Sequence, residues 1–454
     1  MSSRELRPEY VPRFYVEGVP EDRFPKQGML PREAHELVGQ EIRFDGDPWR
    51  NLATFVTTWM EPEAEDLILH SLQTNFIDHA EYPQSAEVER RCIRMLADLF
   101  NAPGETTGAR CQGSSEAIML GALAAKWRWR KAREAAGKDT SRPNLVFGGD
   151  VHVVWEKFCR YFDVDPRMIP LKPGKYTIEA EDVEPHLDED TIAVVAVLGT
   201  TFTGQADDVA GLNDLLVGVR EQRGLDIPIH VDAASGGFVW PFIYPEVVWD
   251  FRLEQVHSIN TSGHKFGLVY PGIGWLVFRS TDDLPDDLVF YENYLGETDA
   301  TFTLNFSTGS AKMIAQYYMF CRLGRQGYEA SIGAMKSNAE FLADGLEKSG
   351  RFEIVGQGAD QLPLVCFKLA GEPEFDEFDV AGQLAAERGW MLPAYTLPPD
   401  AQDVTVLRAL IKSNVSRYRA ETLIGDIAKA CATLDKKGGL HPDMRKRVKT
   451  GTGY

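Results

Sequence analysis

A lysine in this chain lies where an amine could act as a nucleophile. In the segment 258-SINTSGHKFG-267, an apolar strand ends, small polar residues follow, and His264 and Lys265 come next. The small residues would let a flat ligand approach the backbone, and a lysine placed there can form an imine with an aldehyde. Because a lone lysine after a strand is usually an ordinary surface residue, this interpretation needs support from elsewhere in the chain.

A second motif places a carboxylate at a strand end. Asp232 ends the apolar strand of 229-IHVDAASGGF-238, and Ala233 and Ala234 leave space beside it. Such a carboxylate could keep a pyridine nitrogen protonated, because opposite charge at close range favours the proton and makes the ring an electron sink. For this motif alone, an Asp that caps a turn is at least as common.

A third motif could bind phosphate. In 113-GSSEAIML-120, a glycine and the pair Ser114 and Ser115 open an amphipathic helix, whose N–H groups and hydroxyls could cradle an anion. An ordinary helix cap explains most such sequences. The three motifs together, however, supply what pyridoxal phosphate needs: a phosphate site, a partner for the ring nitrogen and a lysine for the imine.

The elements around these motifs predict how they are positioned. Apolar runs alternate with amphipathic helices, a pattern that favours a mostly parallel sheet covered on both faces. Ligands of such sheets bind beyond the carboxyl ends of the strands. The expected strands are 145–147, 192–198, 227–231, 256–259 and 273–278, and the expected helices include 115–135 and 206–224.

The composition of the chain and the pattern of its apolar residues divide it into three parts. Residues 1–49 are polar and rich in Pro, Arg and Glu, which is typical of an arm. Residues 50–332 hold the alternating strands and helices of a large cofactor-binding domain. Residues 333–454 follow a pattern of helix, strands and helix, which predicts a small α+β domain.

The composition excludes several classes of protein. With 68 acidic and 48 basic side chains, the net charge of −20 disfavours nucleic-acid binding. No run approaches the ~20 apolar residues of a membrane helix, and the N-terminus has no apolar signal segment. The six cysteines form no CxxC pair or metal-ligand spacing, so neither a metal site nor a disulfide framework is expected. Scattered thiols suit a reducing cytoplasm, the expected location.

Over most of its length the sequence resembles the group II pyridoxal-phosphate decarboxylases, and most closely the bacterial and plant glutamate decarboxylases. The blocks that carry the resemblance are 50-RNLATF-55, 81-EYPQS-85, 113-GSSEA-117, 125-AKWRWRK-131, 229-IHVDAASGGF-238, 248-VWDFRL-253, 263-GHKFGL-268, 305-NFS-307 and 406-VLR-408. The resemblance implies the aspartate-aminotransferase type I fold, an α/β fold with a large, mixed or parallel seven-stranded sheet. It also implies a homodimer at minimum, a hexamer in some relatives, with active sites at the subunit interface.

The resemblance also implies roles for single residues toward pyridoxal 5'-phosphate. Lys265 would form the imine, Asp232 would face the pyridine nitrogen, and Ala234 would lie beside the ring. The phosphate would be bound by Ser114, Ser115, Ser262 and His264. Thr201 in 199-GTTFTG-204 would contact the ring substituents, while Phe306 and Ser307 would reach the phosphate of the neighbouring subunit.

The implied reaction converts L-glutamate to 4-aminobutanoate and CO₂ through an external aldimine and a quinonoid. Thr54, Asn75 and Asp78 match residues that hold the distal carboxylate, and Arg408 matches the residue on the α-carboxylate side. Tyr294 falls on the loop that carries a proton donor to Cα.

His152, in 151-VHVVWEKF-158, departs from the pattern, because bacterial and plant glutamate decarboxylases usually carry Gln there. Many other group II decarboxylases have a His there, stacked on the ring, and His152 is a second candidate proton donor. A buried core His is the structural alternative. The final residues KTGTGY contain no terminal His of the kind that plugs some bacterial relatives at neutral pH, so that mode of acid switching is not expected.

Three other functions compete with glutamate decarboxylation. The substrate could be aspartate, cysteine sulfinate or an aromatic amino acid, although Thr54 and Asn75 favour a short acidic side chain over an apolar one. The chemistry could be transamination or carbon–carbon lysis. A binding module that keeps the fold without catalysis is the third alternative, and the complete set of Lys265, Asp232 and His264 disfavours it.

Overall fold

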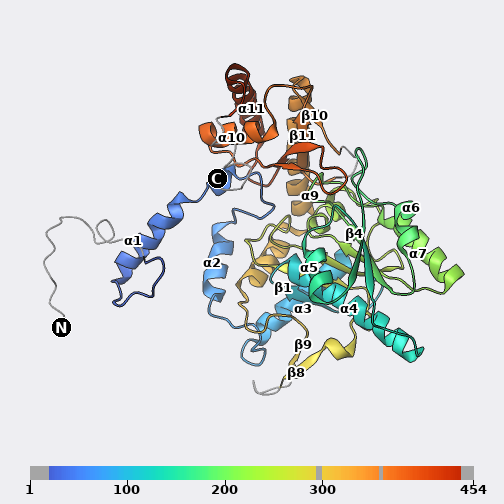
Figure 1. The fold of residues 1–454 in the computed structure, drawn as a ribbon. Helices are drawn as coiled ribbons and strands as arrows, with labels where there is room; N and C mark the ends of the chain where they lie inside the picture. The colour runs from blue at the N-terminus through green and yellow to red at the C-terminus, as the bar shows by residue number, and fades with distance from the viewer. Residues whose placement is uncertain (1–19, 293–298, 357–360, 441–454) are drawn as a thin grey trace, which may run out of the picture.

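The computed structural model describes residues 20–292, 299–356 and 361–440, so Tyr294 lies outside the described residues. A central seven-stranded sheet has the order β1-β7-β6-β5-β4-β2-β3 (Figure 1). β7 runs antiparallel to both neighbours and the other pairs are parallel, so the sheet is mixed, as predicted. Its strands are β1 Gly108–Cys111, β2 Asn144–Gly148, β3 Asp165–Ile169, β4 Thr191–Val197, β5 Ile229–Asp232, β6 Val256–Thr261 and β7 Gly274–Phe278.

The inner strands of the sheet are buried on both faces, which explains their continuous apolar runs. Along β4, Val194 and Ala196 belong to the same hydrophobic cluster as Leu212 and Leu216 of α7. The alternate residues, including Val195, belong to a second cluster with α4 and α5. The helices of this part are α2 Pro62–Ser71, α3 Pro83–Leu99, α4 Ser114–Ala135, α5 Val154–Tyr161, α6 Ala180–Val183, α7 Val209–Arg223 and α8 Trp240–Ile243.

A second, antiparallel sheet with the order β10-β11-β13-β12 lies in the C-terminal part of the chain. Its strands are β10 Phe352–Ile354, β11 Leu364–Leu369, β12 Ala394–Thr396 and β13 Thr405–Leu410, and its helices are α10 Glu377–Arg388 and α11 Arg417–Lys437. The long helix α9, Ala311–Lys348, contacts α2 and α3 as well as β10 and β11, and it kinks at Gly324 (φ 55°, ψ −171°). The boundary predicted at residue 332 therefore falls within α9, and the domain division remains a prediction.

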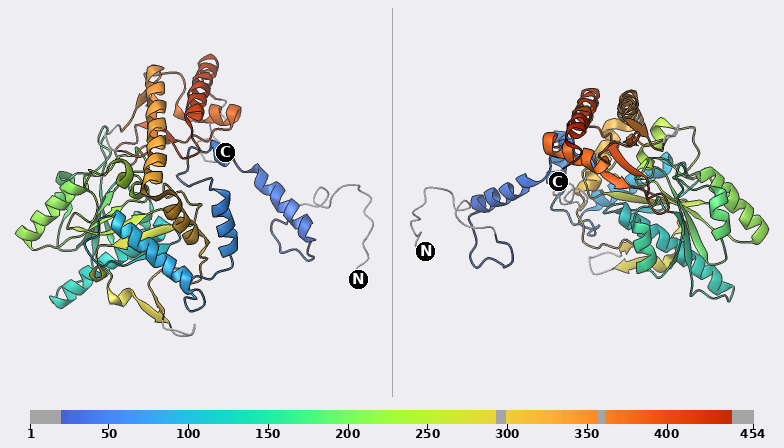
Figure 2. Two further views of the ribbon diagram at one scale, coloured as in Figure 1. Left: turned by 180° about the vertical axis from the view of Figure 1, so that it is seen from behind. Right: turned by 45° about the horizontal axis from the view of Figure 1, so that its top comes forward.

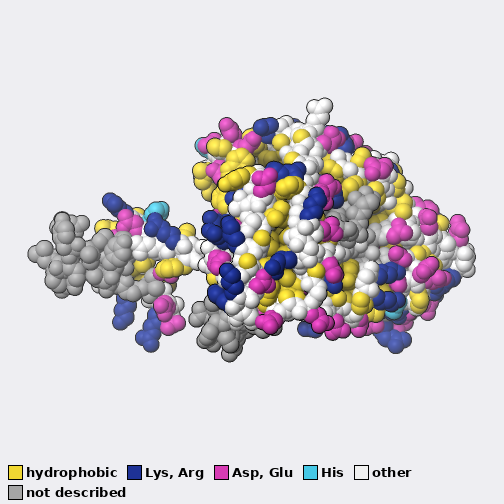
Figure 3. All heavy atoms as spheres, turned by 90° about the horizontal axis from the view of Figure 1, so that it is seen from above, with side chains coloured by type: hydrophobic (Ala, Val, Ile, Leu, Met, Phe, Trp, Pro, Cys, Tyr) yellow, Lys and Arg dark blue, Asp and Glu magenta, His cyan; other side chains and the backbone are white. Residues whose placement is uncertain are grey.

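The described part of the N-terminal arm extends away from the body of the molecule, as both views in Figure 2 and the view from above in Figure 3 show. It contains α1, Pro31–Glu41, and exposes Leu30, Val38, Ile42 and Phe44. A two-stranded ribbon of β8, Phe290–Glu292, and β9, Asp299–Thr301, projects elsewhere from the body. Within the described ranges, no helix combines the length and apolar character needed to cross a membrane.

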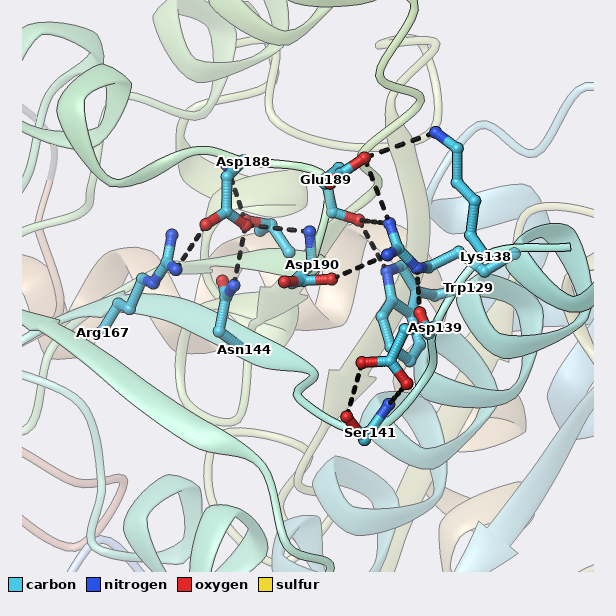
Figure 4. Close-up of polar contacts among 11 residues, drawn as sticks. Trp129, Lys138, Asp139, Ser141, Asn144, Arg167, Asp188, Glu189 and Asp190 are labelled. Atoms are coloured by element: carbon cyan, nitrogen blue, oxygen red, sulfur yellow. Dashed lines mark hydrogen bonds and ion pairs between the residues drawn. The ribbon is translucent and has the colours of Figure 1, made fainter. Parts of the chain in front are cut away.

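Hydrogen bonds and ion pairs connect neighbouring elements at the end of the sheet where β2 and β4 begin (Figure 4). Arg133, near the end of α4, pairs with Asp190 at 3.2 Å and with Glu189 at 3.5 Å. Asn144, the first residue of β2, donates through Nδ2 to Asp188 Oδ1 at 2.9 Å. These contacts join α4 and the loop before β4 at the amino ends of the strands.

Shortening a side chain between α7 and the sheet should destabilise the fold. Leu212 is fully buried in the hydrophobic cluster, so Leu212→Ala leaves a cavity that should cost about 2–5 kcal/mol of unfolding free energy. Glu221→Ala, at an exposed position of the same helix, is the matched control and should change stability by less than about 0.5 kcal/mol. Urea unfolding followed by circular dichroism measures both, and equal midpoints would contradict the packing described.

Candidate active site

The carboxyl ends of four neighbouring parallel strands, β6, β5, β4 and β2, surround one cavity, as expected for an open α/β sheet. The cavity has a volume of about 380 Å³. Nine of the predicted cofactor residues line it: Ser114, Ser115, His152, Thr201, Asp232, Ala234, Ser262, His264 and Lys265. Positions separated in sequence by more than 150 residues thus come together.

One end of the cavity is built to hold an anion. Ser114 begins α4, so the unpaired N–H groups of the first helical turn open onto the cavity. Ser114 Oγ and Ser262 Oγ lie 2.7 Å apart. A Cβ atom at Gly274 of β7 would lie 2.7 Å from the backbone nitrogen of Ser114, so only glycine lets the strand approach this turn so closely.

The amine of Lys265 reaches the cavity and donates to Ser235 Oγ at 3.1 Å. Burial lowers the pKa of Lys265 to about 8, the charge of Asp232 acts in the opposite direction, and the charge of Arg408 lowers the pKa further. Thr57 holds the backbone of this lysine, because its Oγ1 donates to the Lys265 carbonyl at 2.9 Å. The neutral amine is the form that attacks an aldehyde, so this environment favours the nucleophile.

Asp232 presents a buried carboxylate to the cavity. Asn260 Nδ2 donates to Oδ1 at 3.0 Å, the backbone N–H of Ala234 donates to the same oxygen at 3.2 Å, and Trp155 Nε1 donates to Oδ2 at 2.9 Å. All three donors are neutral, and no cation of the described residues forms an ion pair with this carboxylate. A protonated ring nitrogen would supply the missing positive charge.

Two histidines complete the wall of the cavity. His264 Nδ1 accepts from the backbone N–H of Ile273 at 3.3 Å, and burial lowers the pKa of His264 to about 4. The neutral ring therefore carries its proton on Nε2. His152 Nδ1 accepts from the N–H of Val154 at 3.3 Å, which places the proton of its neutral form on Nε2 as well. Each ring can thus donate one hydrogen bond from Nε2.

Arg408, on β13 of the second sheet, lies beside the cavity and does not line it. Its guanidinium donates to the carbonyl of Thr201 at 2.6 Å and to the carbonyl of Ala53, and it lies 5.0 Å from the ring of Phe55. The same ring is 5.1 Å from Lys265 Nζ, so the segment around Thr54 contacts both the arginine and the lysine.

Four of the remaining predicted residues lie on two paired segments that do not line this cavity within the same chain. Asn75 pairs with Gly309 in an isolated bridge, and the N–H of Phe76 donates to the carbonyl of Thr308 at 2.7 Å. This pairing brings the predicted substrate residues Asn75 and Asp78 close to the segment of Phe306 and Ser307. None of these four lines the cavity of Lys265.

The sequence motifs contained further residues of the site that the sequence interpretation missed. Ser235 contacts Lys265, while Trp155 and Asn260 contact Asp232. Asp150 lines the cavity with both carboxyl oxygens buried, and burial raises the pKa of Asp150 to about 7. Ser235, Trp155 and Asn260 lie inside the quoted motifs, whereas Asp150 directly precedes one.

The residues of the cavity fit pyridoxal phosphate. A helix N-terminus with serines suits the phosphate, an unpaired carboxylate suits the ring nitrogen, and a lysine with a lowered pKa suits the aldehyde. These features, on a sheet of this topology, define a fold type I enzyme of the pyridoxal-phosphate class.

Comparisons with known proteins agree with this class. A profile described as "Pyridoxal-dependent decarboxylase conserved domain" matches residues 24–370. A glutamate decarboxylase of Petunia hybrida is 48% identical over 438 residues, which cover 96% of this chain and 87% of that protein. A glutamate decarboxylase of Aliivibrio fischeri is 43% identical over 428 residues, with 93% of this chain and 91% of that protein covered. The chain belongs to the pyridoxal-dependent decarboxylase family.

Solved structures confirm the fold. The structure of a Lactobacillus brevis glutamate decarboxylase superposes with a TM-score of 0.90 at 39% identity, covering 93% of this chain and 97% of that one. An Oryza sativa structure that contains pyridoxal phosphate and tryptamine has a TM-score of 0.76 at 20% identity, and it shows the shared fold alone. The family, the fold class and the cofactor predicted from the sequence are therefore confirmed.

The lowered pKa of Lys265 predicts how cofactor loading depends on pH. At a pKa of about 8, about one tenth of the lysine is neutral at pH 7, against fewer than about one in a thousand at its usual value. The rate at which apo-protein captures pyridoxal phosphate should rise about tenfold from pH 6 to 7 and level off above about pH 8. Stopped-flow absorbance measures this rate. A rate that still rises steadily from pH 9 to 10 would contradict the lowered pKa.

Proposed function

We propose that this protein is a glutamate decarboxylase that converts L-glutamate to 4-aminobutanoate and CO₂. The observation that carries the proposal is the single cavity in which Lys265, Asp232 and the phosphate turn of α4 meet. Identities of 42–48% to glutamate decarboxylases from plants and bacteria, over most of each chain, support glutamate as the substrate.

When bound, pyridoxal phosphate supplies an electron sink for the electron pair that a departing carboxylate leaves on Cα. Lys265 would hold the cofactor covalently through its amine. Asp232 would keep the ring nitrogen protonated, which strengthens the sink by fixed electrostatics. Ser114, Ser115, Ser262 and His264 would bind the phosphate.

Other residues would orient the substrate and return a proton. The distal carboxylate of glutamate is assigned to Thr54, Asn75 and Asp78, and the α-carboxylate side to Arg408. After CO₂ leaves, Cα needs a proton, which we assign to Tyr294 or to His152, whose Nε2 carries one in the neutral ring. Thr201 and Ala234 would border the cofactor ring.

The complete site would require a second copy of the chain. Asn75, Asp78, Phe306 and Ser307 lie on two paired segments and do not line the cavity of their own chain, so we assign them to the site of the partner in a homodimer. The exposed apolar side chains of the arm, such as Val38 and Ile42, support packing on another subunit. We place the protein in the cytoplasm, and a hexamer is the larger assembly that remains open.

Substrate choice tests the proposed activity directly. With cofactor added, CO₂ release from L-glutamate should exceed release from L-aspartate, L-cysteine sulfinate and aromatic amino acids by at least about a hundredfold, because a site built for one polar group rejects analogues that leave it unpaired. Lys265→Ala should lower kcat by at least about a thousandfold. Preference for an aromatic amino acid, or a Lys265→Ala variant with wild-type turnover, would overturn the proposal.

Mixing two inactive variants tests the shared site. Lys265→Ala removes the lysine, and Asn75→Asp places a negative charge against the substrate's distal carboxylate while keeping the size of the side chain. If Asn75 serves the partner's site, co-expression should restore up to about one quarter of wild-type activity, because half of the random dimers carry one intact site. Each variant expressed alone is the control. No activity above that of the single variants would place Asn75 in the site of its own chain.

A further inference from the structure

A chain of buried polar groups runs behind Asp232, away from the cavity. Asn260 Nδ2 donates to Asp232 Oδ1 at 3.0 Å, and Asn260 Oδ1 lies 2.8 Å from His230 Nε2. His230 Nδ1 lies 2.7 Å from Ser258 Oγ. Each of the four side chains is no more than 5% exposed. A neutral imidazole suits this place, because burial lowers the pKa of His230.

The register of two parallel strands creates this chain of contacts. On β5 and β6, His230 lies opposite Ser258, and Asp232 lies opposite Asn260. Residues two apart on a strand point to the same face, so the four side chains share one face of the sheet. The contacts follow from the backbone pairing and do not depend on a loop.

Each hydrogen bond among these four side chains can have only one direction. An ionised carboxylate offers acceptors alone, so Asn260 must present its NH₂ group to Asp232 and its carbonyl oxygen to His230. That oxygen needs a donor, so His230 must carry its proton on Nε2. His230 Nδ1 is then an acceptor, and the hydroxyl of Ser258 donates to it. The tautomer of His230 thereby matches the amide direction that the carboxylate requires, and its Nε2 proton holds the Asn260 oxygen in place.

His230 also contacts the second side-chain donor to Asp232. Its ring packs edge-on against Trp155, with the ring centroids 5.1 Å apart, and Trp155 Nε1 donates to Asp232 Oδ2. On the other side, α4 leaves room for the imidazole only through Gly121, where a Cβ atom would lie 2.7 Å from His230 Cε1. One histidine thus supports both side chains that orient the carboxylate.

We propose that His230 is a positioning residue that acts through Asn260 and Trp155 to fix the orientation and the acceptor character of the Asp232 carboxylate, and thereby the proton on the cofactor's ring nitrogen. This inference rests on the proposed role of Asp232. Without the Nε2 proton of His230, the carbonyl oxygen of Asn260 loses its donor and is left buried and unsatisfied. The amide then shifts, its hydrogen bond to Asp232 Oδ1 weakens, and the carboxylate is free to rotate away from the ring.

The test uses cofactor-loaded full-length protein with pyridoxal phosphate labelled with ¹⁵N in the ring. His230→Leu removes both ring nitrogens, whereas His230→Gln can still place an N–H near the position of Nε2. Gly121→Ala displaces the imidazole without removing it, and alanine favours the helix more than glycine does. His257→Gln, at the start of β6 and paired with Asp283, is the matched control for loss of a partly buried histidine outside the chain of contacts.

We expect His230→Leu and Gly121→Ala to move the ¹⁵N shift toward that of unprotonated pyridine. They should also lower kcat for glutamate by about 10- to 100-fold, the range typical of residues that orient a ligating group, with KM changed less than about threefold. His230→Gln should restore most of both values, and His257→Gln should change neither.

The outcomes separate this inference from the proposed function. If wild-type protein fails to decarboxylate glutamate, the proposed function fails. If wild-type protein is active and Asp232→Asn moves the ¹⁵N shift, but folded His230→Leu and Gly121→Ala leave the shift and kcat unchanged, the role of His230 alone is refuted. If His230→Leu does not fold, the other two variants test the role of His230. An unchanged ¹⁵N shift in Gly121→Ala would refute that role. An unprotonated ring nitrogen in His230→Gln would refute it as well.

Discussion

The site depends on one uncompensated charge: the carboxylate of Asp232 is held inside the protein by three neutral donors and lacks a cationic partner among the described residues. Burying a charge in this way is costly unless a ligand or neighbouring group compensates it. A parallel sheet makes the arrangement possible, because it brings strand ends and a helix N-terminus to the same edge. The fold thus holds a buried negative charge that a protonated ring nitrogen would compensate.

The two ends of the sheet serve different purposes. Where β2 and β4 begin, Asp188, Asp190 and their partners form direct ion pairs and hydrogen bonds. At the opposite end of the sheet, ionisable groups such as Lys265, which follows β6, and Asp150, which follows β2, have no ion pair within the described part of the chain. Satisfied charges stabilise one end, and unsatisfied charges create binding capacity at the other.

The sequence predicted the buried strands and the residues that follow them, because continuous apolar runs are a strong local signal. It missed β1 and β3, the two edge strands of the large sheet. β3 is mostly exposed and reads DPRMI, so no apolar run marks it. The contact of Asn260 with Asp232 could not be predicted either, because it depends on the register between β5 and β6, which neither motif contains. The placement of Asn75 beside Gly309 likewise depends on a pairing between distant segments.

Helix α9 connects the turn that carries Lys265 to the second sheet. On one side of its bend at Gly324, Gln316 donates to the carbonyl of Gly267 at 3.1 Å, and on the other side Tyr328 donates to the same oxygen at 3.0 Å. Gly267 is two residues from Lys265, so both segments of the bent helix donate a hydrogen bond to the turn that carries the amine. Because the far arm packs on β10 and β11, one continuous helix connects the second sheet to the turn that carries Lys265. The position of the amine and the packing of the C-terminal sheet therefore share one structural support.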